Sequence, residues 1–225
     1  MNELLLLLEV VIVFSMLLIS KKIFGKTGLY LWIGLASVIA NIQVVKSINL
    51  FGISATLGNV MFASNFLATD ILSECYGKQE AKKGVYIGIF SIIIYLISTQ
   101  IMLTFRPNEI DIAENAMRTL FNLAPRVCIS SLIMYSFANI ADVFLYNKLK
   151  QKMSNKNMWI RNNVSTIICN CLENFGFTFL AFAGVYTVKD MLIIACSTSI
   201  IEILIAICDT PFLYLAKKQN NNTVL

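Results

Sequence analysis

The stretch that decides the fold reads NFLATDILSECYGKQEAKK and covers residues 65–83. It begins as an apolar segment, carries Asp70 and Glu74 one helical turn apart, and breaks at Gly77 into a cluster of lysines. An apolar helix that ends in lysines is typical of a membrane span that reaches water on the cytoplasmic side. The two carboxylates need a separate explanation, because a charge near the centre of a bilayer costs at least ~2.5 kcal/mol on insertion scales.

The composition of the whole chain also indicates a membrane protein. Of the 225 residues, 57% are hydrophobic and 14% are charged, whereas roughly a quarter of an ordinary soluble domain is charged. Seven apolar stretches are long enough, or nearly so, to cross a bilayer; they lie near 4–20, 29–48, 57–75, 84–104, 124–147, 163–184 and 191–215. Each is predicted to be an α-helix, because lipid offers no partners for open backbone groups. The predicted fold class is therefore an all-α, polytopic membrane helix bundle.

The basic residues are distributed unequally between the two sides of this bundle. With seven spans, thirteen lysines and arginines fall on one side and three on the other. The positive-inside rule makes the side with more basic residues cytoplasmic. The N-terminus is then outside the cell's inner (cytoplasmic) membrane, and the C-terminus is in the cytoplasm. The first stretch is the shortest and contains Glu9; without it, the other six spans keep the same orientation.

The same pattern divides the chain into regions and loops. The regions are an N-terminal transmembrane helix with its cytoplasmic loop (1–28), a six-helix core (29–217) and a disordered cytoplasmic tail (218–225). The outer segment 105–121 is polar and is expected to form a short surface helix. The inner segment 148–161 is basic and would attract anionic headgroups of the lipid bilayer, with Trp159 at the level of an aromatic belt.

Several function classes are excluded by what the chain lacks. It contains no histidine, so it has no Ser-His-Asp or Cys-His nucleophile and no HExxH zinc site. It has no GxxxxGK[ST] loop for ATP, and its six cysteines do not have zinc-ribbon spacing. The net charge of +5 follows the membrane pattern rather than forming a nucleic-acid surface. We therefore predict no cofactor, no metal site and no direct nucleic-acid partner. A membrane enzyme that uses two aspartates stays open on these grounds, although our overall prediction is that the protein is not an enzyme.

The sixth and seventh apolar stretches carry polar residues in a helical pattern. One face of the sixth stretch holds Asn163, Thr166, Asn170, Glu173 and Asn174. One face of the seventh stretch holds Thr198, Glu202 and Asp209. Counted from the short connection near Thr187, Glu173 is 14 residues back and Glu202 is 15 forward, so a hairpin places them at one depth. Two carboxylates there must take up a proton, hold a cation or face different cavities. We favour a transport or ligand role, because intramembrane acids usually mark pathways.

Further polar residues lie nearer the cytoplasmic end of the predicted helices. Asp70 shares a stripe with Asn59 and lies about two turns inside the basic cluster. Asp142 occupies a similar depth on the fifth stretch. For Asp70, a place facing a substrate cavity and a buried interhelical hydrogen bond are both open. Glu74 is expected at the membrane interface, paired with Lys78 at i+4.

Two cations lie at the outer ends of predicted helices. Arg126 follows a proline at the start of the fifth stretch, and Lys46 is near the end of the second. A contact with lipid headgroups and a role in a site are equally open for each.

The polar residues occur in segments that together resemble one known family. These segments are LFGISATLGNVMFASNFLATDILSECYGKQEAKK (50–83), ANIQVVK (40–46), PRVCISSLIMYSFANIADVFLYNKLK (125–150), RNNVSTIICNCLEN (161–174) and CDTPFLYLAKK (208–218). Their combination and order resemble the queuosine precursor transporters, also called the VUT family. The resemblance begins near residue 36 and leaves the first helix outside it.

This resemblance implies a six-helix core that imports a small nucleobase, queuine or another 7-deazaguanine, for tRNA modification. It also implies a role for the acids that match the family's motifs, Asp70, Asp142 and Glu173, and for Asn41 and Asn170. A carboxylate suits this substrate, because a guanine-like edge presents adjacent N–H donors. The chain departs from the family at Glu173, where Asp is more frequent, and at Glu202, where many relatives have Lys. The reversed charge at Glu202 would suit a cationic precursor or a proton-coupled cycle.

Other readings of the sequence remain open. The chain could be a substrate-binding subunit that is energised by a separate ATP-driven complex, which would show as ATP-dependent uptake. It could be a membrane-embedded diacid enzyme that uses Asp70 and Asp142, although the local motifs of such enzymes are absent. A scaffold would tolerate the loss of the intramembrane acids. Homo-oligomerisation is also left open.

Overall fold

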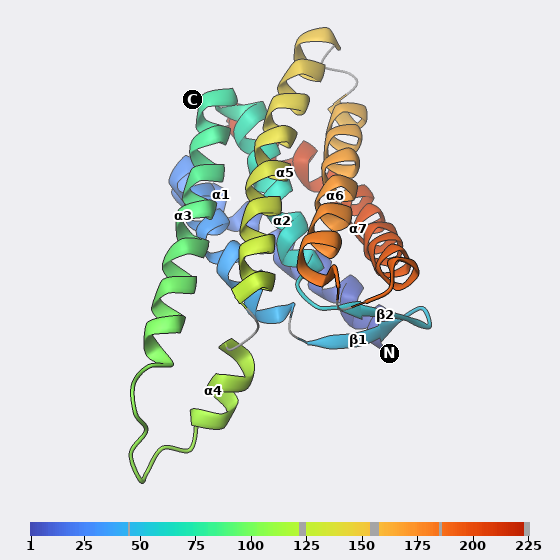
Figure 1. Ribbon diagram of the computed structural model, residues 1–225. Helices are drawn as coiled ribbons and strands as arrows, with labels where there is room; N and C mark the ends of the chain where they lie inside the picture. The colour runs from blue at the N-terminus through green and yellow to red at the C-terminus, as the bar shows by residue number, and fades with distance from the viewer. Residues whose placement is uncertain (45, 122–124, 154–157, 185, 223–225) are drawn as a thin grey trace.

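The computed structural model describes residues 1–225 except 45, 122–124, 154–157, 185 and 223–225. Its helices are α1 (Asn2–Gln43), α2 (Asn59–Cys75), α3 (Lys78–Met102), α4 (Glu114–Phe121), α5 (Pro125–Lys152), α6 (Met158–Phe182) and α7 (Val188–Asn222), and its two strands are β1 (Ser47–Leu50) and β2 (Ile53–Thr56). The long helices form a bundle, with α4 and the strands at one end and the C-terminus at the other (Figure 1). The helical fold class is confirmed, whereas the two strands were not predicted from the sequence.

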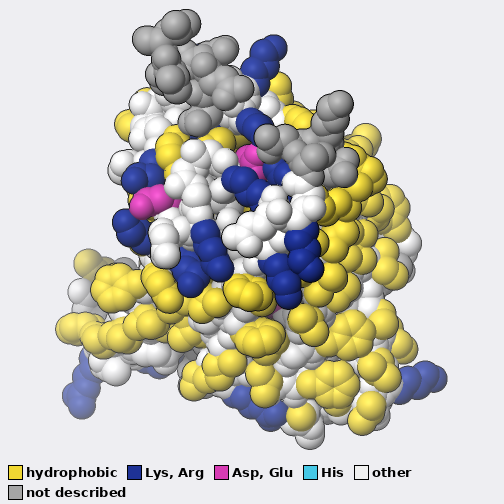
Figure 2. Space-filling model, turned by 90° about the horizontal axis from the view of Figure 1, so that it is seen from above, with side chains coloured by type: hydrophobic (Ala, Val, Ile, Leu, Met, Phe, Trp, Pro, Cys, Tyr) yellow, Lys and Arg dark blue, Asp and Glu magenta, His cyan; other side chains and the backbone are white. Residues whose placement is uncertain are grey.

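Length and composition allow five of the described helices, α1, α3, α5, α6 and α7, to cross a membrane. Their outer faces expose large apolar side chains, such as Phe90 at 63% and Ile207 at 55%. Apolar atoms cover much of the surface seen in Figure 2. An apolar surface of this extent is stable in lipid rather than in water. The protein is therefore a multi-pass membrane protein.

Helix α2 differs from the other long helices because it lies inside the bundle. It has 17 residues, and all of those from Asn59 to Ser73 are buried except the half-buried Phe62. It packs against α1, α3, α5 and α7. Its predicted stretch, 57–75, is thus a helix enclosed by the others, and this position places its polar side chains in the interior.

Helix α1 contains the first two predicted stretches, 4–20 and 29–48, as two arms that meet at a sharp kink. Gly25 has φ 58° and ψ −135° there, a backbone conformation that is essentially restricted to glycine. Beyond the kink the arms touch, since the Ser20 hydroxyl donates to the Gly28 carbonyl at 3.0 Å. The second arm ends at Gln43 rather than at residue 48.

A β-hairpin follows α1 and closes the end of the bundle opposite the C-terminus (Figure 1). Its strands pair antiparallel with Leu50 opposite Ile53, and Phe51 and Gly52 form the two-residue turn with φ values of 51° and 77°. Two positive φ values are what a tight hairpin turn of the I′ type requires. The N-terminus of α1 holds this hairpin, because Asn2 Nδ2 donates to the Asn49 carbonyl at 2.9 Å.

The lysine-rich ends of the helices meet at the opposite end of the bundle. Figure 2 views this end and shows Lys and Arg side chains gathered on it. Lys26 beside the α1 kink and Lys83 of α3 both pair with Glu80, at 2.8 and 3.0 Å. Helix α7 continues to Asn222 in this region, so it extends into the segment 218–225 that was predicted to be a disordered tail. Residues 223–225 of that segment lie outside the described residues.

At the end of the bundle that holds the hairpin, the expected surface helix is present (Figure 1). The segment 105–121 contains α4, none of whose residues is buried. Asp111 caps its start, because its carboxylate accepts the backbone N–H groups of Ala113 and Glu114 at 2.7 and 3.1 Å.

The close contact between the two arms of α1 predicts a stability effect. A Cβ at residue 28 would lie 2.2 Å from the Ser20 carbonyl oxygen, so backbone must move to admit it. Gly28→Ala should therefore lower the free energy of unfolding by about 1–3 kcal/mol, the usual cost of overpacking. Thermal unfolding of the detergent-solubilised protein measures this, with the exposed neighbour Thr27→Ala as the control. Equal melting temperatures for both variants would contradict the close approach.

Candidate functional site

The interior of the bundle holds an unusual number of polar side chains. They come from α2, α5, α6 and α7 and include Asn65, Thr69, Asp70, Ser73, Asn139, Asp142, Asn147, Asn162, Ser165, Thr166, Asn170 and Asp209, all of them buried. Polar and charged groups are costly at membrane depth unless they have partners or a function. Their convergence from four helices, with the enclosed α2 among them, marks this interior as the candidate site.

Three aspartates form the first group of acids, which we call the aspartate cluster: Asp70 of α2, Asp142 of α5 and Asp209 of α7. Each is 0% exposed. The carboxyl groups of Asp70, Asp142 and Asp209 lie close enough to interact electrostatically, and neither oxygen of Asp142 has a hydrogen-bond partner among the described residues. Thr166 Oγ1 donates to Asp70 at 3.5 Å, and Asn162 Nδ2 donates to Asp209 at 2.6 Å. The structure thus brings two predicted residues, Asp70 and Asp142, together.

Asp209 entered the sequence analysis only as part of the polar face of the seventh stretch, not as a candidate site residue. Its spacing of seven residues from Glu202 was the signal that could have identified it. Asn162 was missed altogether, because the face chosen for the sixth stretch ran through Asn163 instead. Asn163 is only half-buried and donates to Thr210 Oγ1 at 2.7 Å, whereas Asn162 is 0% exposed.

Glu173 of α6 and Glu202 of α7 form a second group of acids, which we call the glutamate pair. Glu202 is 7% exposed and accepts a hydrogen bond from Asn174 Nδ2 at 2.7 Å, so the two helices pair at the level that the hairpin count predicts. Glu173 is half-buried and lies close enough to Glu202 for the two charges to interact. Within the described residues, the Glu173 carboxylate has neither a hydrogen bond nor an ion pair. It is therefore available to a ligand.

The prediction that Glu74 pairs with Lys78 at the interface was wrong. The Glu74 side chain is 2% exposed and contacts three cations: Arg161 at 2.6 Å, Lys217 at 2.6 Å and Lys150 at 3.3 Å. Lys78 Nζ lies instead 4.6 Å from the centre of the Phe144 ring. Tertiary contacts from α5, α6 and α7 thus replace the predicted pair within α2 and α3. We call Glu74 with its three cations the Glu74 ion cluster.

Arg161 is the residue of this cluster that sequence reasoning missed. It was counted only among the cytoplasmic cations, yet its side chain is 0% exposed. Besides Glu74, it contacts the Tyr146 ring, whose centre lies 5.7 Å from the guanidinium carbon. An arginine in the first turn of a membrane helix gave no sequence signal that distinguishes this buried position from an interfacial one.

The predicted asparagines lie at different places in the bundle. Asn41, near the end of α1, donates to the Ser37 carbonyl at 2.8 Å and accepts from Ser131 of α5 at 3.3 Å. Asn59 and Asn170 are 6% and 2% exposed, and each has one amide atom without a partner among the described residues. These asparagines therefore keep hydrogen-bonding capacity inside the bundle.

The predicted cations and Trp159 lie away from the acids. Lys46 is exposed between α1 and the hairpin, and its backbone N–H donates to the Gln43 carbonyl at 2.9 Å. Arg126 is exposed and donates to the Leu180 carbonyl at 2.8 Å, where a cation favourably meets the C-terminal end of α6. Trp159 is 53% exposed at the start of α6. The structure does not bring these three residues to the polar interior.

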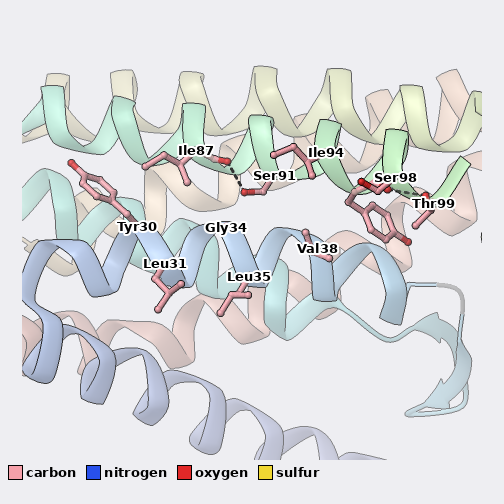
Figure 3. Close-up of a pocket in the computed structure, with 11 residues that line it drawn as sticks. Tyr30, Leu31, Gly34, Leu35, Val38, Ile87, Ser91, Ile94, Ser98 and Thr99 are labelled. Carbon is pink, nitrogen blue, oxygen red and sulfur yellow. Dashed lines mark hydrogen bonds between the residues drawn. The ribbon is translucent and has the colours of Figure 1, made fainter. Parts of the chain in front are cut away.

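A cleft of about 490 Å³ opens on the surface between α1 and α3, apart from the acids. Figure 3 shows its lining, which is largely apolar and includes Leu31, Leu35 and Ile94, with Tyr30 at one end and Thr99 at the other. None of the acids of the interior contributes to it. The polar interior, rather than this cleft, is the candidate functional site.

Comparison with known proteins decides the family. A family model described as "Putative vitamin uptake transporter" matches residues 56–216. A protein of Bacillus subtilis named "Probable queuosine precursor transporter" is 40% identical over 213 residues, which cover 94% of this chain and 93% of that protein. The chain belongs to this transporter family. An Escherichia coli protein named "Queuosine precursor transporter" is 25% identical over 170 residues, which cover 72% of this chain and 73% of the relative. No solved structure matches the chain.

Membership of the transporter family decides between two readings of the aspartate cluster. The contact between Asp70 and Asp142 places two carboxyl groups together, as a diacid enzyme would require. The family consists of transporters, so the protein is not such an enzyme. The acids of the interior are therefore to be understood as parts of a transporter.

The Glu74 ion cluster predicts a large stability effect. Glu74→Gln leaves the fully buried Arg161 without its carboxylate, and breaking a buried ion pair costs about 3–5 kcal/mol. The matched control is Glu80→Gln, which removes a carboxylate that also binds two lysines but lies nearer the surface, so the loss should be smaller. Unfolding of both variants in detergent gives the comparison. A Glu74 variant no less stable than the Glu80 variant would contradict this account.

Proposed function

We propose that this protein imports a queuosine precursor, queuine or another 7-deazaguanine base, across the cytoplasmic membrane for use in tRNA modification. The names of the relatives from B. subtilis and E. coli support the substrate class. The observation that carries the proposal is the Glu173 carboxylate, which lies beside Glu202 inside the bundle and has no partner in the described part of the chain. A soluble base that crosses lipid needs such a polar site to replace its hydration.

The glutamate pair has the chemistry that the base requires. A 7-deazaguanine presents a ring N–H and an exocyclic amino group side by side, and one carboxylate accepts both. Within the described ranges, both Glu173 oxygens are free for this contact, while Asn174 holds Glu202 in place at 2.7 Å. Asn170 lies about one turn before Glu173 on α6 and has an amide oxygen without a hydrogen-bond partner among the described residues. We assign base recognition to Glu173 and place Asn170 beside it.

Glu202 adds a preference for a positively charged substrate. Aminomethyl-bearing precursors and queuine itself carry a basic amine in addition to the guanine-like edge. A second carboxylate next to Glu173 can bind this amine as an ion pair, which is strongest where water is excluded. The glutamate pair thus offers one carboxylate to each polar part of the base: Glu173 to the guanine-like edge and Glu202 to the amine.

We further propose that transport is secondary and coupled to protons, and that the chain spans the membrane seven times with the N-terminus outside. The absence of an ATP-binding loop and the several buried acids favour this mode. The gathering of basic residues at the end that holds the C-terminus supports the orientation (Figure 2). An energising partner complex would instead make uptake depend on ATP.

The proposed orientation has a direct test. A green fluorescent protein fused after residue 225 should fluoresce, because it folds in the cytoplasm. An epitope tag placed before residue 1 should be removed by protease added to intact spheroplasts, because the N-terminus lies outside. A protected tag with a fluorescent C-terminus would reduce the chain to an even number of spans.

The proposed substrate is tested in a bacterial strain that neither makes nor imports queuosine precursors but has the enzymes to use them. Expression of the chain with nanomolar queuine or aminomethyl precursor in the medium should restore queuosine in tRNA. Glu173→Gln should lose at least one charge-assisted hydrogen bond of about 1.5–3 kcal/mol, and hence roughly tenfold or more of the uptake rate at low substrate. The control is Glu109→Gln on the exposed outer loop, which should transport normally.

The outcomes separate the readings. Normal uptake by Glu173→Gln and Glu202→Gln would remove the glutamate pair from the site. No restoration by the wild-type chain with either base, despite its presence in the membrane, would refute the substrate. Restoration that stops when ATP is depleted while the proton gradient is kept would favour the partner complex.

A further inference from the structure

Cations and acids are distributed unevenly within the cytoplasmic half of the interior. Arg161, Lys150 and Lys217 all bind Glu74. Asp70 lies four residues before Glu74, about 6 Å along α2, yet no described ion pair reaches it, nor does one reach Asp142 or Asp209. Three fully buried aspartates thus lie next to a set of cations that is already engaged elsewhere.

This arrangement cannot carry the full negative charge of its acids. Asp70 and Asp142 are 0% exposed and close enough to interact directly, and two ionised carboxylates so placed would repel strongly without water to screen them. A contact between two carboxyl groups becomes favourable when one proton lies between them. The interior therefore needs a positive ligand at this point.

The unsatisfied atoms around the aspartates independently indicate what that ligand is. Five buried oxygens have no partner in the described structure: Asp70 Oδ1, both carboxylate oxygens of Asp142, Asp209 Oδ2 and Asn162 Oδ1. The Asn162 amide nitrogen donates to Asp209 at 2.6 Å, so the atom of Asn162 that lacks a partner is its oxygen. All five atoms are acceptors, and only a hydrogen-bond donor or a cation can satisfy them. Among the described residues, no three acids or cysteines are arranged to hold a metal ion.

We propose that Asp70 and Asp142 bind the proton that drives import, as a site separate from the glutamates that bind the base. The proposal rests on the proposed function, which couples transport to protons, and assigns the residues that carry the proton. A proton from the outer side binds between the two carboxyl groups, travels with the loaded protein, and leaves to the cytoplasm, which restores the ionised pair. No covalent bond is made or broken in this cycle other than the O–H bond of the carried proton.

The groups that face the pair are compatible with this role. They are Asp209 of α7, Cys169 of α6, Tyr146 of α5 and, one turn away, the Glu74 ion cluster. The other two long helices, α1 and α3, also carry charged groups near this end. Lys21 of α1 donates to the Ala216 carbonyl of α7, and Glu80 of α3 pairs with Lys26 and Lys83. Neither Lys21 nor Glu80 therefore faces the aspartate pair. The carboxyl groups are thus the acids positioned to exchange the proton.

The test uses the full-length chain in proteoliposomes with the membrane potential clamped at zero and queuine as the probe. A gradient of one pH unit, acid outside, supports about tenfold accumulation when one proton accompanies each base. Wild type should approach this value. Asp142→Asn should show no accumulation above the outside concentration, but should still exchange internal for external queuine when no gradient is present. The control is Asp190→Asn, an exposed aspartate at the start of α7, which should behave as wild type.

Each result decides the proposal. Accumulation by Asp142→Asn at the wild-type level would overturn it. Loss of both exchange and accumulation in the well-folded variant, judged by its elution in size-exclusion chromatography, would overturn it as well, because the pair would then belong to the base site. Asp70→Asn provides a second variant with the same expectations.

A readout without substrate keeps the proton site separate from the identity of the base. Infrared spectroscopy of the reconstituted protein should show a protonated-carboxyl C=O band that changes with pH and is absent from both Asp142→Asn and Asp70→Asn. The band should persist in Glu202→Gln. If wild type carries no queuine but this band is present, the proposed substrate fails and the proton site stands. If neither variant changes the infrared spectrum, the proton site is refuted whatever the substrate.

Discussion

The Glu74 ion cluster is the interaction on which the rest of the interior depends. One carboxylate on the enclosed α2 holds cations from α5, α6 and α7, so a single side chain ties four helices together at their lysine-rich ends. Buried ions persist only when their partners are in place, since an unpaired charge costs several kcal/mol. By engaging these cations, Glu74 leaves Asp70, one turn deeper, without a counter-ion in the described structure. The stability of the bundle and the chemistry of its interior thus have the same origin.

A gradient of polarity follows from this arrangement. Along the bundle, the cation-rich end is followed by the aspartate cluster and then by the glutamate pair. Around the aspartates, beyond the Glu74 ion cluster, the described atoms without a hydrogen-bond partner are acceptors. Such an interior favours ligands that bring hydrogen-bond donors or positive charge. A protonated, amine-bearing base and a proton both meet this requirement, and they do so at different depths.

The sequence predicted those properties that depend on composition and helical period. Hydropathy located the long helices. Spacing along the sixth and seventh stretches predicted that Glu173 and Glu202 lie at one depth, because an α-helix rises uniformly, and Asn174, next to Glu173, donates to Glu202. It failed where distant segments meet. The hairpin at 47–56 follows from two positive φ values that no hydropathy window detects. The predicted ion pair between Glu74 and Lys78 followed from their i,i+4 spacing. In the structure Glu74 binds Arg161 of α6 instead, because both side chains are buried at the same place.

The two proposed binding sites can be coupled even though their charges repel each other. Asp209, which faces the proton-binding pair, is seven residues from Glu202 on α7, about 10 Å along its axis. Taking this as the scale of the separation between the sites, two like charges repel by about 1.7 kcal/mol at an effective dielectric of about 20. This term opposes simultaneous binding of a cationic base and a proton. Enclosing either acid group without its ligand, however, leaves an uncompensated buried carboxylate, at a cost of several kcal/mol. The second cost is the larger, so a closed form that holds the base while the aspartate pair lacks its proton is disfavoured, and the base then moves in the direction set by the proton.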